Sequence, residues 1–194
     1  MVDQQFKVDA LIDGLPDLRW IRTDVAPSAL GWDVGLAVDA FINLPRSQGL
    51  KVAVGLYGNQ ADIKDGNDKW RQWCRDVLGR VEPTWVVADM ETADAKFFGG
   101  GWQGFIDLWG PLIPELQAMG HKVMGPGTVR GVNTPGPEHF DRILGAIPFD
   151  APSAHFYTAR GRKDHLAWMK LAEEIAVKHG HTWGAVGETG EHGE

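Results

Sequence analysis

Two glutamates stand where a strand-like run of residues gives way to a turn. Glu188 ends the apolar part of "TWGAVGETGEHGE", between Gly187 and Gly190, and Glu91 follows the β-branched run of "TWVVADME". Two carboxyl groups about 5 Å apart can cleave a glycosidic bond with retention, because one protonates the leaving oxygen while the other attacks the anomeric carbon. Glu91 and Glu188 can do this chemistry if the fold brings their carboxyl groups to that distance.

Other polar side chains also gather at the ends of strand-like runs, where ligands meet the chain in parallel α/β proteins. Arg22 and Asp24 share a face by the two-residue period of a strand. Such an inventory is typical of a catalytic site rather than of a stabilising one. Its further members are Tyr57, Asn59, Asp89, Arg130, Ser153, His155 and Tyr157.

The elements that must position these residues follow a regular rhythm of short β-branched or aromatic runs and longer amphipathic stretches. The expected strands are 18–25, 51–58, 84–91, 121–127, 151–158 and 182–188. The expected helices are 8–14, 33–48, 68–80, 102–119, 137–145 and 163–179. This alternation predicts an α/β fold with a parallel sheet and helices outside it.

Three segments in chain order resemble signatures of the clan A retaining glycoside hydrolases, the 4/7 superfamily of (β/α)8 barrels. "VVADMETAD", "DAPSAHFYTARG" and "WGAVGETGEHG" look like the family's strands four, six and seven. The resemblance implies a TIM-type barrel with Glu91 as acid/base and Glu188 as nucleophile. It also implies that Arg22 lies beneath the nucleophile, and that residues 1–194 form a single catalytic domain.

The chain departs from this family at two points. Met90 precedes Glu91 where the family has an asparagine that contacts the sugar 2-hydroxyl, so Asn59 or His155 is expected to supply that contact. A (β/α)8 barrel typically needs about 250 residues, and the family's first and last strands have no counterpart here. We therefore expect a shortened barrel, in which the family's strands two and seven either close on each other or form open edges. Because open edges of a parallel sheet invite pairing with a second chain, we expect a homodimer.

Their surroundings assign the two glutamates different roles. Asp89 and Met90 are expected to raise the pKa of Glu91 through like charge and apolar contact, so that Glu91 holds a proton. If the implied Arg22 contact forms, and His155 or Tyr157 donates a hydrogen bond, Glu188 stays ionised.

Each assignment has a structural alternative. Glu188 can be an exposed loop carboxylate near the terminus, and Glu91 can stabilise the start of a helix. Asp89 and Glu91 can also form an Asp-x-Glu pair like that of chitinases, with a different base. His155 is as well explained by a buried position in the core.

The tryptophans divide into two groups by position. A helical stripe predicts burial against the sheet for Trp70, Trp73, Cys74, Val77, Leu78 and Val81. Trp32, Trp102 and Trp183 fall near the joints between elements, where they can stack on sugar rings, although burial in the core explains them equally well.

Composition excludes several classes of protein. The formal charge of −7 leaves no basic field for nucleic acid, and no apolar stretch reaches the roughly 20 residues that span a bilayer. The single cysteine excludes an internal disulfide, and the histidines near the terminus lack a third spaced metal ligand.

We expect a carbohydrate substrate, no cofactor or metal, and a soluble protein that is cytoplasmic by default. The alternatives are a non-catalytic carbohydrate-binding or structural protein on a degenerate barrel, and a non-functional remnant.

Overall fold

The computed structural model describes residues 19–57, 67–88, 101–128, 136–157, 162–182 and 185–190. The chain divides into two compact units. The first unit is residues 1–86 with 119–121, and the second is residues 87–118 with 122–194. This division does not test whether both units belong to one domain, so the single domain stays a prediction.

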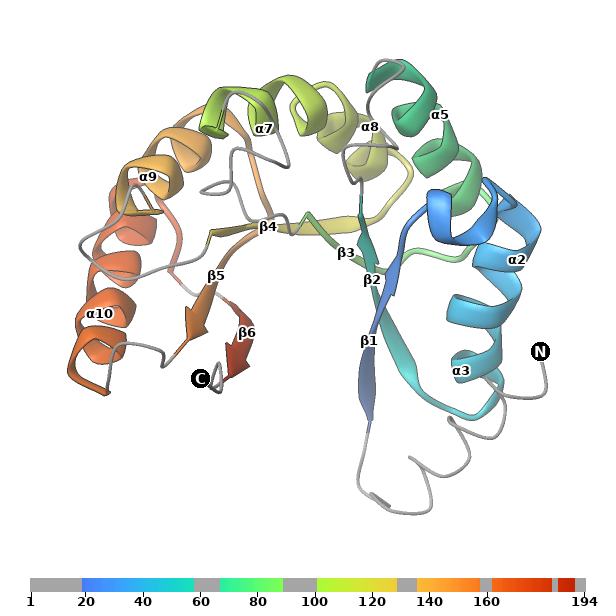
Figure 1. The fold of residues 1–194 in the computed structure, drawn as a ribbon, viewed down its shortest axis with the longest axis horizontal. Helices are drawn as coiled ribbons and strands as arrows, with labels where there is room; N and C mark the ends of the chain where they lie inside the picture. Colours follow the sequence, from blue (N-terminus) through green and yellow to red (C-terminus); the bar gives the residue numbers. More distant parts are fainter. Residues whose placement is uncertain are drawn as a thin grey trace. The chain divides into compact units, whose positions relative to one another are not determined.

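The first unit is built on two parallel strands, β1 (Trp20–Val25) and β2 (Lys51–Leu56), which lie side by side in Figure 1. Between them run a short 3-10 helix and a helical stretch with a π-helical middle. These segments are η1 (Ser28–Leu30), α2 (Val34–Val38), η2 (Asp39–Asn43) and α3 (Leu44–Ser47). Helix α5 (Asn67–Leu78) follows β2, and the short strand β3 (Trp85–Val87) begins at the end of this unit.

The core of the first unit forms where the apolar side of β2 meets the helices. Val52, Val54 and Leu56 alternate along β2 and are fully or almost fully buried. The predicted stripe on α5 is confirmed for Trp70, Trp73, Cys74, Val77 and Leu78, all of which are buried. Burial raises the pKa of the Cys74 thiol, which behaves as a small apolar group.

A buried histidine ties the end of α5 to the start of β3. His121 accepts a hydrogen bond at Nδ1 from the Thr84 backbone N–H at 3.2 Å, and its Nε2 lies 3.2 Å from the Leu78 carbonyl oxygen. Burial lowers the pKa of His121, which favours the neutral ring that can accept at one nitrogen and donate at the other.

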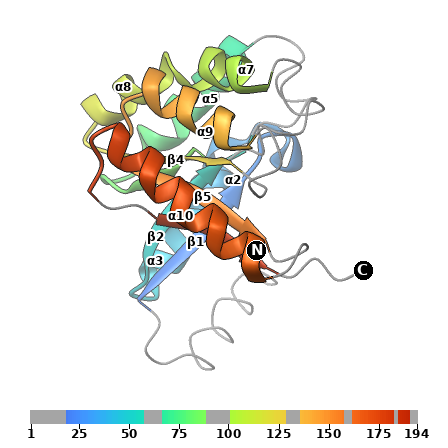
Figure 2. The same cartoon turned by 90° about the vertical axis from the view of Figure 1, so that its left-hand side faces the viewer.

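The second unit repeats the alternation of strands and helices. It contains α7 (Gly101–Trp109), α8 (Leu112–Ala118), β4 (Lys122–Thr128), α9 (Gly136–Ala146), β5 (Ala151–Tyr157), α10 (Arg162–Lys178) and β6 (Ala185–Gly190). Strand β5 pairs in parallel with β4 and with β6. Helices α9 and α10 lie side by side, as Figure 2 shows. Phe140 of α9 meets Trp168 of α10 edge to face, with ring centroids 5.8 Å apart.

The helix predicted over 102–119 is two helices. Gly110 and Pro111 separate α7 from α8, because proline has no backbone N–H and its ring clashes with the preceding helical turn. The expected helix over 8–14 lies outside the described residues.

The predicted parallel sheet is confirmed. Its six strands follow chain order from β1 to β6, and the barrel is incomplete in the described part of the chain. No helix among the described residues is long and apolar enough to cross a membrane.

Candidate functional site

Three polar side chains of the first unit meet at the carboxyl ends of β1 and β2. Arg22 Nε donates to Asp24 Oδ1 at 2.8 Å, and Arg22 Nη2 donates to the Tyr57 hydroxyl at 2.8 Å. We call Arg22, Asp24 and Tyr57 the strand-end cluster. The Arg22 side chain is 21% exposed and that of Asp24 is 45% exposed, so solvent reaches the carboxylate more readily than the guanidinium.

The strand-end cluster depends on small residues in the neighbouring strand. Register places Arg22 beside Ala53 and Asp24 beside Gly55. A Cβ added at Gly55 would lie 3.1 Å from Asp24 Cγ and 3.5 Å from Arg22 Nε, and it would overlap Asp24 Oδ1. The absence of a side chain at residue 55 therefore makes room for the ion pair.

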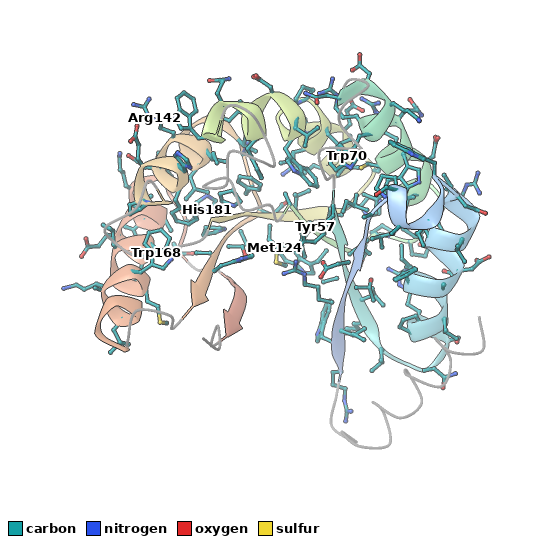
Figure 3. The ribbon with its side chains drawn as sticks, viewed as in Figure 1. Tyr57, Trp70, Met124, Arg142, Trp168 and His181 are labelled. Atoms are coloured by element: carbon teal, nitrogen blue, oxygen red, sulfur yellow. The ribbon has the colours of Figure 1, made fainter. Side chains whose placement is uncertain are left out.

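Both backbone polar groups of Tyr57 are hydrogen-bonded. Its backbone N–H donates to the Val25 carbonyl oxygen at 2.8 Å, and its own carbonyl oxygen accepts from Trp70 Nε1 at 3.0 Å. Figure 3 labels Tyr57 and Trp70, which come from the end of β2 and from α5. Because Trp70 is fully buried, this contact fixes the residue that carries the phenol.

The second unit places two polar residues of β5 in the interior. Ser153 and His155 are each only 1% exposed, and alternation along the strand puts them on one face. Trp168 Nε1 donates to the His155 carbonyl oxygen at 2.9 Å. The Ser153 hydroxyl has no hydrogen-bond partner within the described ranges.

A register irregularity follows Ala154 and sets His155 opposite Glu188 of β6. Such bulges turn a side chain to a new direction and are frequent next to active sites. For Glu188 and Tyr157 the structure describes the backbone, which fixes their positions in the strand register.

The remaining predicted site residues lie outside the described part of the chain. These are Asn59, Asp89, Glu91 and Trp183, together with Arg130. The distance between Glu91 and Glu188, and the position of Arg22 beneath Glu188, therefore stay predictions. Among the described residues, no group of three or more His, Cys, Asp or Glu side chains could hold a metal ion.

The structure adds two residues to which the sequence assigned no role. Asp24 and Tyr57 appear in the strand-end inventory, but of the three members of the cluster only Arg22 received a role. A signal was present in the sequence, because Arg22 and Asp24 have strand spacing and a glycine lies near the end of the next strand.

Comparison with known proteins finds a structural neighbour. No family model matches the chain, and no curated protein matches it. A solved structure that matches is D-psicose 3-epimerase with D-tagatose from Clostridium cellulolyticum H10. The TM-score is 0.53 at 11% identity, over 97% of this chain and 79% of the epimerase chain. The chain has a TIM-type fold. At this identity the likeness establishes the fold and not the reaction.

This finding corrects the functional prediction. The structural neighbour is a sugar epimerase and not a clan A glycoside hydrolase, so the prediction of a retaining glycosidase is wrong. The choice of Glu91 and Glu188 as site residues stays a prediction. The physical reason is that the carboxyl-end edge of a TIM-type sheet collects polar side chains for many different reactions. Acidic residues at strand ends locate a site in such a fold without specifying hydrolysis.

Proposed function

We propose that the chain is an enzyme that binds a small polyhydroxylated sugar and rearranges it without hydrolysis, by transfer of a proton next to the sugar carbonyl. The observation that carries the proposal is the strand-end cluster, in which Arg22 contacts both Asp24 and Tyr57 at 2.8 Å. The TIM-type fold supports it, because active sites of this fold lie at the carboxyl ends of the strands. The structural neighbour, a D-psicose 3-epimerase with D-tagatose, supports the choice of a sugar.

The chemistry of the strand-end cluster suits a sugar. A carboxylate accepts hydrogen bonds from sugar hydroxyls, and a guanidinium donates in a fixed planar geometry. Removal of a proton next to a carbonyl places negative charge on the carbonyl oxygen, which an arginine can stabilise. In the proposed enzyme Asp24 accepts from hydroxyls and Arg22 faces the carbonyl oxygen.

The second unit carries proton-transfer groups of its own. His155 and Glu188 are register neighbours on β5 and β6, and imidazole and carboxylate groups are the commonest carriers of protons in enzymes. His155→Gln and Glu188→Gln in the assay below test separately whether the second unit takes part.

The test is proton exchange between solvent and sugar. The protein is incubated with D-tagatose and other ketohexoses in D2O, and NMR follows deuterium entering the sugar and the appearance of a second sugar. Loss of a positioned electrostatic donor typically slows an enzyme by about 100- to 1,000-fold, so Arg22→Met is expected to slow exchange by that order. Asp24→Asn removes a charged acceptor for the sugar hydroxyls and is expected to slow exchange as well.

Asp141→Asn is the matched control, because Asp141 also accepts charged hydrogen bonds but lies on helix α9. It is expected to keep the wild-type exchange rate. The proposal fails if the wild type shows no exchange and no new sugar, or if Asp24→Asn and Asp141→Asn behave alike. Binding of the sugar without exchange would reduce the protein to a carbohydrate-binding module.

A further inference from the structure

The loop after β1 holds a tryptophan in a costly backbone conformation. Trp32 has a φ of 65°, in the left-handed region, and follows Gly31, which has a φ of 57°. Bulky residues rarely adopt this conformation, because their Cβ approaches the following carbonyl oxygen. Glycine or asparagine would make the same turn with less strain, so the turn alone does not account for a tryptophan.

The backbone around Trp32 is fixed on both sides. The Trp32 N–H donates to the Pro27 carbonyl oxygen at 2.8 Å, and the Asp33 N–H donates to the Leu30 carbonyl oxygen at 3.1 Å. Asp33 then caps helix α2, because its Oδ1 accepts from the Leu36 N–H at 3.0 Å. The indole is therefore presented from a rigid turn.

The first turn of α5 links this indole to the strand-end cluster. Lys69 Nζ lies 4.0 Å from the centroid of the Trp32 ring, within the range of a cation–π contact. The next residue, Trp70, donates to the Tyr57 carbonyl oxygen at 3.0 Å. Neighbouring residues of one helical turn thus hold the Trp32 ring and the backbone of Tyr57.

We propose that Trp32 is a substrate-binding residue, whose indole stacks on the C–H face of the sugar that the strand-end cluster binds. Lys69 covers one face of the ring, and the sugar takes the other. The face of an indole is electron-rich and the C–H face of a pyranose carries partial positive charge, so the two attract. The inference rests on the proposed function and adds the residue that orients the sugar.

Two substitutions separate a binding role from a structural one. Trp32→Asn removes the ring and relaxes the backbone, because asparagine adopts the left-handed conformation readily. Trp32→Phe keeps an aromatic face and keeps the strain. A binding role predicts that the asparagine variant loses affinity while its Tm is equal to or above the wild-type Tm, and that the phenylalanine variant keeps wild-type affinity.

The measurement is ¹⁹F NMR of protein labelled with 5-fluorotryptophan, titrated with D-tagatose, together with thermal unfolding. The Trp32 signal, assigned by its loss in Trp32→Phe, is expected to shift on addition of sugar. Trp32→Asn should raise the Kd about 3- to 10-fold, the range expected for loss of one aromatic contact. Trp32→Phe should stay within about 2-fold of the wild type.

A second tryptophan is the control. Trp20 also has a lysine over its ring, Lys51 at 5.3 Å, but it begins β1, at the strand end opposite the cluster. Trp20→Ala should leave the Kd unchanged. A lower Tm with wild-type Kd in Trp32→Asn overturns the inference, as does loss of binding in Asp24→Asn alone. Absence of binding by the wild type overturns the proposed function and this inference with it.

Discussion

Two aspartates anchor charged clusters in this chain, and their surroundings differ. Asp24 of the first unit pairs with Arg22 on the same strand, beside a glycine of the neighbouring strand. Asp141 of the second unit lies on α9 and accepts from Lys178 Nζ at 2.7 Å and from His179 Nε2 at 2.6 Å, at the end of α10. Both carboxylates are partly exposed, at 45% and 35%.

The two clusters differ in what they require of the backbone around them. The Asp141 cluster joins two ordinary helices, and all its members lie on their outer surface or ends. The Asp24 cluster needs residue 55 to have no side chain, which weakens a strand that would gain from one. A residue that lowers local stability in this way is typical of a functional site, whereas stability alone explains the Asp141 arrangement.

The largest loss of stability is expected from Gly55→Ala, which breaks the Asp24 cluster and leaves the Asp141 cluster intact. The new Cβ would overlap Asp24 Oδ1 and press on Arg22 Nε, so both side chains must move. A displacement of about 1 Å can slow an enzyme by about 100-fold, and overpacking costs about 1–3 kcal/mol of stability. Proton exchange into D-tagatose and thermal unfolding measure the two effects.

Gly35→Ala is the matched control for Gly55→Ala. Its Cβ would meet Asp33 Oδ1 at 3.3 Å, a tight contact that a small shift relieves, and alanine favours the helix. We expect wild-type exchange and equal or higher stability. If both alanine variants lose exchange equally, residue 55 has no special relation to a site.

The positions of Gly55 and Gly110 illustrate how far the sequence predicts this fold. Strands and helices were predicted because apolar periodicity is a local property, and the stripe on α5 is buried as expected. The break between α7 and α8 was missed, although Gly110 and Pro111 carry its signal. The contact of Arg22 with Tyr57 depends on the pairing of β1 with β2, which no local pattern encodes.

The predicted reaction was wrong for a different reason. Polar residues at strand ends are a general property of TIM-type sheets, and the resemblance to clan A enzymes added a reaction that the structural neighbour does not support. Sequence reasoning predicted polar residues at the carboxyl ends of strands, where ligands bind in TIM-type folds. It did not find which side chains meet there, because that depends on register and on the room left by small residues.

Asp141→Asn is expected to give the next largest loss of stability, and it tests the same comparison at the other cluster. The amide keeps the shape of the side chain and loses the charge that Lys178 and His179 contact. A partly exposed charged pair of this kind contributes about 1 kcal/mol or less, so the free energy of unfolding should fall by about that amount. Chemical denaturation measures this change, and sugar exchange should be unaffected.

Asp24→Asn should give the reverse result, with slower exchange and little change in the free energy of unfolding. If Asp24→Asn and Asp141→Asn lose stability and exchange in the same proportion, the two clusters have the same role.

The pH dependence of stability tests the Asp141 cluster more finely. Hydrogen bonding from Lys178, partly opposed by burial and assisted by His179, holds the pKa of Asp141 below its ordinary value of 3.8. A carboxyl whose folded pKa is depressed adds stability above its unfolded pKa and loses it as the pH falls through the folded value. The Tm difference between wild type and Asp141→Asn should therefore be constant above about pH 5 and shrink below about pH 3.8.

Burial also lowers the pKa values of His121, His139 and His181, which destabilises the fold as the pH falls below about 6.5. These histidines are present in both proteins, so their effect cancels in the difference. A difference that instead vanishes between about pH 5 and 6.5 would assign the Asp141 effect to a histidine.

Lys178→Met is expected to have the smallest effect. The Lys178 side chain is 61% exposed, so water competes for its ammonium and salt screens its charge. Methionine keeps much of the aliphatic stem, and we expect a loss of about 0.3 kcal/mol at low salt that disappears at about 1 M NaCl. Equilibrium denaturation of the wild type and Lys178→Met at both salt concentrations measures it. A loss as large as that of Asp141→Asn would mean that Lys178 holds the carboxylate by itself, and that His179, at 2.6 Å from the same group, contributes little to stability.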